Sequence, residues 1–174
     1  MPQPAPQQPA PQQPAPTAEA LYREAESALA RRDSTAADVA LARLLAEYPQ
    51  SALADQALYE RAQLAYRRRA WVDARRHLAA LAQLPATPLA EPGRYLVCRI
   101  AVETRDGDAV HCLASYRATY PKSAHDRDVL GLLVQLVHAR QGCAGARALV
   151  DELARRYADS ALARAWRATC PEAR

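Results

Sequence analysis

Small and apolar side chains recur every three or four residues along most of the chain, with polar residues between them. This is the spacing of one face of an α-helix. Small residues such as Ala25, Ala28 and Ala37 stand where helices must approach closely, and larger aliphatic residues fill the remaining positions. The pattern predicts amphipathic helices near residues 18–31, 34–47, 52–69, 71–84, 92–105, 108–119, 123–140, 144–157 and 160–169.

Residues that stop or start helices separate these segments. Asp, Ser and Gly break the pattern at 32–34, 106–108 and 141–142, where they can cap or turn the chain. Between longer units, Tyr-Pro-x-Ser combines a proline that ends one helix with a serine suited to cap the next. We therefore expect Ser51, Ser123 and Ser160 each to open a helix.

The helical pattern is an internal repeat. Residues 20–25 return 37 positions later as residues 57–62, and Arg31-Arg32 returns as Arg68-Arg69. A shift of 72 aligns residues 48–51 with 120–123, and a shift of 109 aligns 51–54 with 160–163. Each copy holds two helices, so the chain is expected to contain four repeats and a closing helix.

The repeat resembles that of the tetratricopeptide repeat family, a helix-turn-helix unit of about 34 residues. Ala25, Ala37 and Pro49 match its two small positions and its proline, and Ala62 with Ala74 repeats the small pair. The resemblance covers residues 18–169. It implies an all-α fold, a right-handed α-solenoid of about four helix-turn-helix units plus a C-terminal helix, within a domain of residues 18–174.

This resemblance implies a peptide-binding groove lined by the first helix of each pair. The family's groove positions fall on Glu19, Tyr22, Glu26 and Leu29, then on Gln56, Tyr59, Gln63 and Tyr66, and the row extends to Tyr95, Gln135 and His138. Tyrosine rings offer contact area at small entropic cost, and glutamine amides can hydrogen-bond to an extended peptide. The alternative is that Tyr22 and Tyr59, which share one repeat position, pack between neighbouring repeats.

The first seventeen residues have a different composition from the rest. Residues 4–8 recur as residues 9–13, and the segment contains no charge and no large apolar side chain after Met1. Alternating proline favours a polyproline II spacer. Residues 1–17 are therefore expected to link the repeats to an upstream anchor or domain, through which alone we expect membrane association; a natural N-terminal tail is the alternative.

Charge does not indicate a nucleic-acid partner. The net charge is 23 − 19 = +4, and the clusters at 67–69 and 75–76 have acidic residues within a turn or two. Aromatic residues do not interleave with the arginines as a stacking platform requires. We expect a solvated face here, or a preference for an acidic protein partner. No apolar run approaches the roughly twenty residues of a membrane span.

Catalytic motifs are not found in the sequence. The five glycines are scattered, so there is no phosphate-binding loop, and there is no Gly-x-Ser-x-Gly, His-Glu-x-x-His or Cys-x-x-Cys. We expect no enzyme activity, no cofactor, no metal and no small-molecule substrate. The predicted function is a non-catalytic scaffold for a peptide or protein partner. The alternatives are a sensory or regulatory tail of a membrane-anchored regulator in the periplasm and a permanent subunit of an envelope complex.

The four cysteines suggest two disulfides. Cys98 and Cys112 flank the turn at residues 106–107, and Cys143 opens one helix while Cys170 ends the antiparallel helix that follows. We therefore predict the pairs Cys98–Cys112 and Cys143–Cys170. Four buried thiols in a cytoplasmic protein are the main alternative, and a zinc site of Cys98, His111, Cys112 and Cys143 is another.

Location follows from the cysteines and from the repeat junctions. Disulfides persist in oxidising compartments, and the Tyr-Pro-x-Ser junctions look like those of bacterial envelope members of the family. These members include the outer-membrane assembly lipoproteins and the periplasmic cell-division coordinator. The periplasm or cell envelope is the predicted location, with the cytoplasm as the alternative.

Overall fold

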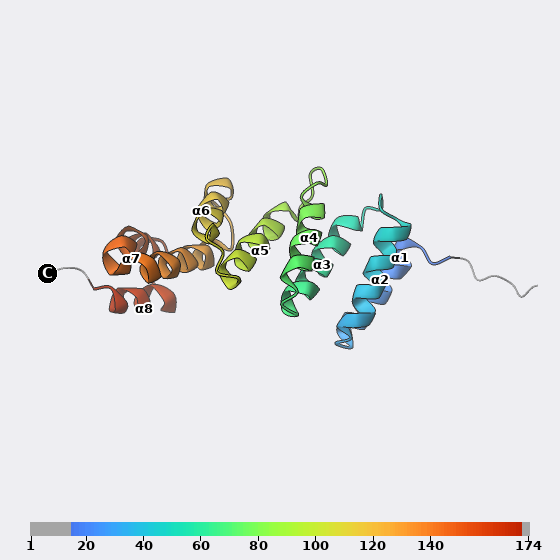
Figure 1. Ribbon diagram of the computed structural model, residues 1–174, viewed down its shortest axis with the longest axis horizontal. Coiled ribbons are helices and arrows are strands. Elements are labelled where there is room, and N and C mark those ends of the chain that lie inside the picture. The colour runs from blue at the N-terminus through green and yellow to red at the C-terminus, as the bar shows by residue number, and fades with distance from the viewer. Residues whose placement is uncertain (1–14, 172–174) are drawn as a thin grey trace, which may run out of the picture. The chain divides into compact units, whose positions relative to one another are not determined.

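The computed structural model describes residues 15–171, and its regular elements within that range are all α-helices (Figure 1). They are α1 (Ala18–Ala30), α2 (Ser34–Glu47), α3 (Ala54–Arg67), α4 (Trp71–Leu81), α5 (Ala90–Glu103), α6 (Ala109–Thr119), α7 (Asp126–Arg156) and α8 (Ala161–Thr169). The predicted all-α fold of helix-turn-helix units is therefore confirmed. Most of the proposed N-terminal spacer, residues 1–14, lies outside the described residues.

The described chain divides into two compact units whose boundary, between Ala57 and Leu58, falls within α3. In the first unit α1 and α2 pack side by side (Figure 1). Leu21 and Ala25 of α1 are fully buried, as are Leu41 and Leu44 of α2. The alanines expected to permit close packing are thus in the interior.

In the second unit, α4 packs on α5, α5 on α6, α6 on α7 and α7 on α8. A core cluster joins Ala62 of α3, Leu78 of α4 and Ile100 of α5. Gly93 permits the close approach of α4 and α5, because a Cβ atom there would lie 2.9 Å from Leu81 Cδ2. Within the described residues, no helix is long and apolar enough to cross a membrane.

Two predicted helix starts are wrong. Helix α3 begins at Ala54 and α7 at Asp126, three residues after Ser51 and Ser123. Each serine instead opens a turn, since its hydroxyl accepts a hydrogen bond from the backbone N–H two residues later, and Ser123 also bonds the Tyr116 hydroxyl at 2.7 Å. Ser160 does cap α8, accepting from Ala163 N at 3.1 Å.

The first helix of each pair ends on a left-handed residue. Arg32, Arg69 and Arg105 have φ of 62°, 58° and 54°, and Gly142 has φ of 64° at the break inside α7. After Arg32 the chain forms a Schellman turn, in which Asp33 N donates to Ala28 O at 2.9 Å. The break at Gly142 lies where the sequence predicts the boundary between 123–140 and 144–157.

Candidate functional site

The partly exposed residues Tyr59, Gln63 and Tyr66 of α3 and Tyr95 and Arg99 of α5 form the tyrosine–arginine cluster. The two helices are the first members of neighbouring helix pairs. They share the core cluster to which Ala62 and Ile100 belong, which fixes their spacing. The cluster therefore joins sequence-predicted groove residues from two repeats on one part of the second unit.

Arg99 supplies the positive charge of this cluster. Its Nη1 donates to the Tyr95 hydroxyl at 3.2 Å, its guanidinium carbon lies 5.8 Å from the Tyr95 ring centroid, and its Nη2 lies 3.8 Å from Glu103 Oε1. Its Nε atom is buried without a hydrogen-bond partner among the residues described. Burial opposes the charge, but the bond to Tyr95 and the nearby Tyr66 hold the pKa of Arg99 above its ordinary value.

The tyrosines also contact the core. Burial raises the pKa of Tyr59, a hydrogen bond with Gln63 opposes the rise, and Tyr95 is close enough to add to it. Tyr66 packs edge-on against Trp71, with ring centroids 5.4 Å apart. Tyr95 stacks on His125, with ring centroids 4.1 Å apart. All three tyrosines are nevertheless partly exposed, so packing and binding are compatible roles here.

The other predicted groove residues belong to other helices. Tyr22 is half-buried and Glu26 exposed on α1, in the first unit. Gln135 is exposed on α7, and His138 packs against Trp166 of α8 with ring centroids 5.3 Å apart. Among the predicted groove residues of the second unit, those of α3 and α5 are the ones that lie together.

Sequence reasoning missed Arg99 as part of the site. The available signal was its position one helical turn after Tyr95, a spacing at which two side chains of a helix meet. The family's groove positions do not include it. Its role comes from the approach of α3 and α5, which the sequence pattern alone does not show.

The cysteines lie in the two expected pairs at disulfide distance. The sulfurs of Cys98 and Cys112 are 2.08 Å apart, and those of Cys143 and Cys170 are 2.02 Å apart. The first pair joins α5 to α6, and the second ties the end of α8 to the start of the second segment of α7. In this arrangement the cysteines of the alternative zinc site offer no thiolate, because Cys98 and Cys112 are bonded to each other and Cys143 is bonded to Cys170.

His138 lies close to one of these pairs. Its ring nitrogen and the sulfurs of Cys143 and Cys170 lie within 4.8 Å of one another. Sulfurs bonded to each other offer no thiolate, the form that binds zinc. With the Cys143–Cys170 disulfide formed, these three residues therefore do not provide a zinc site.

An ionic cluster closes the junction of α6 and α7. Arg117 Nε lies 2.7 Å from Asp126 Oδ1 and its Nη2 lies 2.6 Å from Glu152 Oε1, while the Tyr157 hydroxyl donates to Asp126 Oδ2 at 2.6 Å. Burial alone would raise the pKa of Asp126, but the bonds from Arg117 and Tyr157 hold it below its ordinary value. The charged groups pair with one another, so this cluster stabilises the packing of neighbouring repeats.

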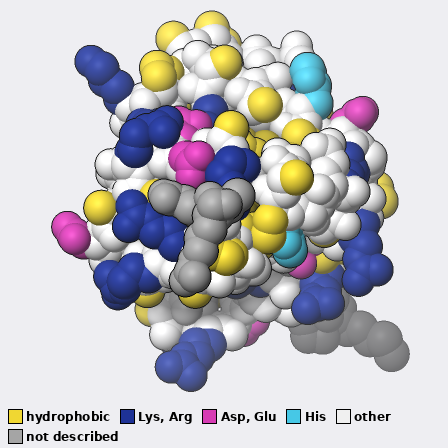
Figure 2. All heavy atoms as spheres, turned by 90° about the vertical axis from the view of Figure 1, so that its left-hand side faces the viewer, with side chains coloured by type: hydrophobic (Ala, Val, Ile, Leu, Met, Phe, Trp, Pro, Cys, Tyr) yellow, Lys and Arg dark blue, Asp and Glu magenta, His cyan; other side chains and the backbone are white. Residues whose placement is uncertain are grey.

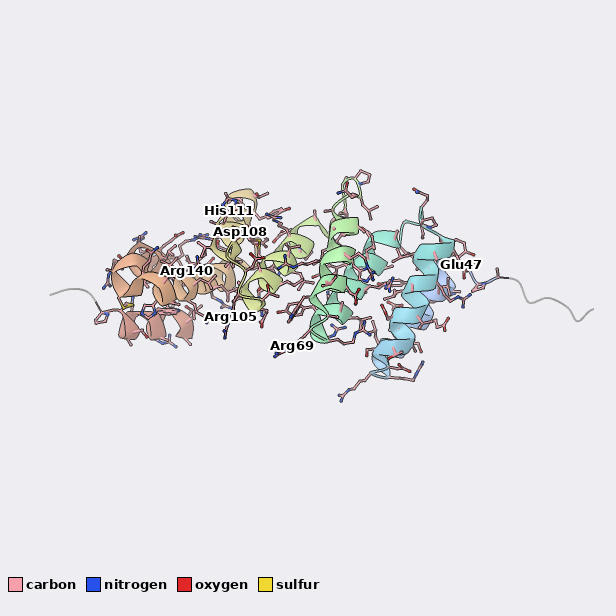
Figure 3. All side chains as sticks on the ribbon, in the orientation of Figure 1. Glu47, Arg69, Arg105, Asp108, His111 and Arg140 are labelled. Atoms are coloured by element: carbon pink, nitrogen blue, oxygen red, sulfur yellow. A yellow bond between two sulfur atoms is a disulfide. The ribbon has the colours of Figure 1, made fainter. Side chains whose placement is uncertain are left out.

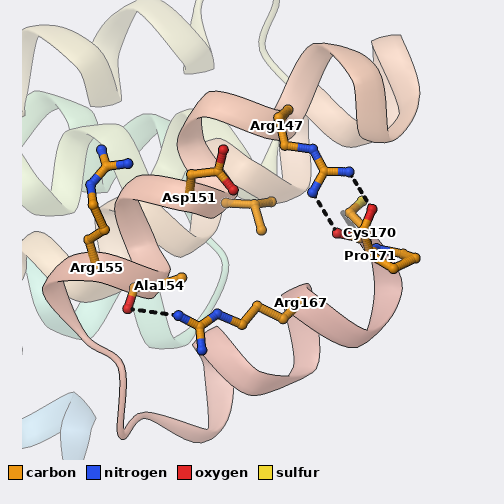
Figure 4. Close-up of a pocket in the computed structure, with 8 residues that line it drawn as sticks. Arg147, Asp151, Ala154, Arg155, Arg167, Cys170 and Pro171 are labelled. Atoms are coloured by element: carbon orange, nitrogen blue, oxygen red, sulfur yellow. Dashed lines mark hydrogen bonds between the residues drawn. The ribbon is translucent and has the colours of Figure 1, made fainter. Parts of the chain in front are cut away.

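A polar cleft of about 500 Å³ lies between the second segment of α7 and α8 (Figure 4). Arg147 of its wall donates to the carbonyl oxygens of Cys170 and Pro171, and Arg167 donates to the carbonyl of Ala154 at 3.4 Å. Two of its three arginines are thus engaged with backbone at the helix ends. We therefore interpret this cleft as structural, because these two arginines hold α8 against the second segment of α7.

Charges of both signs are mixed on the surface. Figure 2 shows Asp and Glu side chains between the Lys and Arg side chains of the face that includes α7 and α8. Figure 3 shows Arg69 and Arg105 pointing out from one edge of the second unit, away from Asp108 and His111. Arg76 pairs with Asp73 at 2.9 Å. This mixture differs from the single-sign stripe typical of nucleic-acid-binding surfaces.

Comparison with protein families matches residues 19–51, which span α1 and α2, to the tetratricopeptide repeat. No curated protein matches the chain. Tetratricopeptide repeats generally mediate protein–protein interactions and are typically non-catalytic. The match covers the first helix pair, and the tyrosine–arginine cluster lies in the pairs that follow it.

Proposed function

We propose that the protein is a non-catalytic scaffold that holds a peptide or a segment of a partner protein against the tyrosine–arginine cluster. The observation that carries this proposal is the position of Tyr66 and Tyr95 beside Arg99, with Tyr59 close to Tyr95, on the first helices of two adjacent pairs. The family match to the first pair supports the same class of function.

The chemistry of the cluster favours an extended segment with a carboxylate. Rigid aromatic rings contribute contact area at small entropic cost, and the Gln63 amide can both donate and accept hydrogen bonds with a peptide backbone. The Arg99 side chain is one-third exposed and its ion pair with Glu103 is long, at 3.8 Å, so a ligand carboxylate that reached its accessible Nη atoms would gain a charge-assisted hydrogen bond. Aromatic and arginine side chains are the types that dominate binding energy at interfaces.

We also propose that the protein works in the periplasm or cell envelope of a bacterium, as do the lipoproteins and the cell-division coordinator that its repeat junctions resemble. Two cysteine pairs at disulfide distance are compatible with an oxidising compartment. In this proposal the N-terminal Pro-Gln segment spaces the repeats from an upstream anchor.

The binding site can be tested with peptides selected on the protein from a displayed random library. The tightest peptide is synthesised and its Kd is measured by fluorescence anisotropy. The double substitution Tyr59→Ala, Tyr66→Ala should weaken binding about 30-fold or more, the loss expected for interface hot spots. Helical content and the cooperativity of melting should remain close to wild type, because both rings are partly exposed.

Three further variants keep the test decisive if the double variant unfolds. Arg99→Gln should weaken the same peptide about tenfold or more. Gln63→Ala should weaken it several-fold, about the value of one or two hydrogen bonds, whereas Gln135→Ala should leave the Kd unchanged. Equal effects of the two glutamine substitutions, or an unaffected Arg99→Gln, would contradict the proposed site.

A further inference from the structure

A second cleft, of about 490 Å³, lies between α4 and α5. Its walls are largely apolar: Leu78, Ala79 and Ala82 come from α4, and Gly93 and Val97 come from α5.

The cleft is separate from the tyrosine–arginine cluster. At 100° per residue, Gly93 and Val97 lie about 180° around α5 from Tyr95 and Arg99. A ligand in the cleft therefore uses the opposite side of this helix. The two sites can be tested independently with substitutions that touch only one of them.

The face of α4 that lines the cleft carries one further exposed apolar residue, Val72. Val72 is 83 % exposed and is one of two large exposed hydrophobic residues among those described. Val72, Arg75, Ala79 and Ala82 have the spacing of one helix face. A large aliphatic side chain that entered the cleft would extend this apolar surface and remove it from water.

The charged residues at the rim of the cleft indicate which charge a ligand should carry beside its aliphatic side chain. Arg94 lines the cleft, is exposed and forms no ion pair with another described residue. Arg75 also lines it and reaches Asp106 at 3.3 Å across an exposed contact. Both charged residues at the rim are therefore cationic, which favours an acidic group on the ligand and disfavours a basic one.

We propose that this cleft is a second docking site, for a peptide segment that presents a large aliphatic side chain next to an aspartate or glutamate. The aliphatic side chain occupies the space above Leu78 and Val97. The carboxylate pairs with Arg94. This interaction goes beyond the proposed function at the tyrosine–arginine cluster and does not depend on it.

The test uses the displayed random library again, with selection in parallel on the wild type and on Ala79→Glu. Ala79 is exposed, so the new carboxylate changes the cleft without burying a charge in the core. Ala80→Glu is the matched control, since Ala80 is an exposed alanine of the same helix that does not line the cleft. One wild-type-selected peptide with the predicted pair of side chains is synthesised and labelled.

The expected Kd of that peptide rises about tenfold or more with Ala79→Glu, because the carboxylate repels the ligand and occupies its space. It rises several-fold with Arg94→Glu and stays unchanged with Ala80→Glu and with Gln63→Ala. Arg140→Glu, at an exposed arginine elsewhere (Figure 3), is the charge control and should have no effect.

Four results would overturn the proposal: no enrichment of the predicted pair on the wild type, selection of basic neighbours, equal binding to Ala79→Glu, or the same loss with Ala80→Glu. Self-association of the wild type that Ala79→Glu abolishes would assign the cleft to a second copy of the chain and would also contradict it. If only Gln63→Ala weakened binding of the peptide, the peptide would bind at the tyrosine–arginine cluster, and the second docking site would be refuted.

Discussion

Replacing Gly142 with alanine should destabilise the protein through its backbone alone. Gly142 has φ 64° and ψ −167°, a region that is essentially restricted to glycine, and a Cβ atom there would meet no atom within 4 Å. The substitution therefore introduces conformational strain without a steric clash. We expect a loss of about 1–3 kcal/mol in the free energy of unfolding.

Gly107→Ala is the matched control. A Cβ atom at Gly107 also meets nothing within 4 Å, but its φ lies outside the left-handed region. Alanine there restricts the unfolded chain and should be neutral or stabilise the protein by up to about 1 kcal/mol. The two substitutions share their chemistry and differ in the backbone conformation that they replace, so only Gly142→Ala should destabilise the protein.

The assay is urea unfolding of the oxidised protein, followed by far-UV circular dichroism. Each kcal/mol also corresponds to a shift of about 2–4 °C in Tm for a chain of this size. Equal effects of the two substitutions, or a gain in stability with Gly142→Ala, would refute the reasoning. They would mean that α7 can run straight through this position, and the break would then not be fixed by glycine.

The remaining predictions concern the ionic cluster and the cysteines. Arg117→Ala should cost about 2–3 kcal/mol in urea unfolding, because Asp126 loses the charge-assisted bond at 2.7 Å and keeps only Arg156 at 2.9 Å and the Tyr157 hydroxyl at 2.6 Å. Arg43→Ala, which breaks an exposed helical pair with Glu47, should cost less than about 1 kcal/mol. The pKa of Asp126 is lower in the folded protein than in the unfolded chain. Its contribution to stability is therefore full above the unfolded pKa of about 4 and is lost as the pH falls through the folded pKa. The stability of Asp126→Asn, measured against pH, should lack this acid loss, and the same acid loss in the variant would contradict the role of Asp126. Closed loops of 14 and 27 residues predict that reduction of each disulfide costs about 3–4 kcal/mol in the chain-entropy account. Mass mapping of alkylated protein from its native compartment should find both pairs, and four free thiols would contradict the proposed location.

The helices are predictable from sequence because their signal is periodic and local. Alanines and leucines at helical spacing place α1 and α2 within a residue of their observed ends, and Asp33 caps α2 by accepting from Ala36 N at 2.9 Å. The pairing of the cysteines is also predictable from sequence, since antiparallel helices joined by a short turn bring Cys98 and Cys112 to within about 4.5 Å of one another along the helix axes. These features depend on residues close together along the chain.

Other features depend on contacts that the pattern does not contain. Arg117 and Glu152 are 35 residues apart, and their ion pair exists only because α6 packs against α7. Ser123 resembles a helix cap in sequence, but its side chain hydrogen-bonds to the Tyr116 hydroxyl and accepts from His125 N within a turn. The arginines with left-handed backbone conformation are partly visible in the sequence, because Arg32 and Arg69 occupy the same repeat position. Nothing in the neighbouring sequence distinguishes them from helical residues.

The central claim is that peptides bind at the tyrosine–arginine cluster, and site-specific photo-crosslinking tests it most directly. A benzophenone side chain replaces either Gln63 or Gln135, and each protein is irradiated with the selected, labelled peptide. We expect an adduct from position 63 that excess unlabelled peptide suppresses, and none from position 135. An adduct only from position 135, or none from position 63 while anisotropy still reports binding, would contradict it.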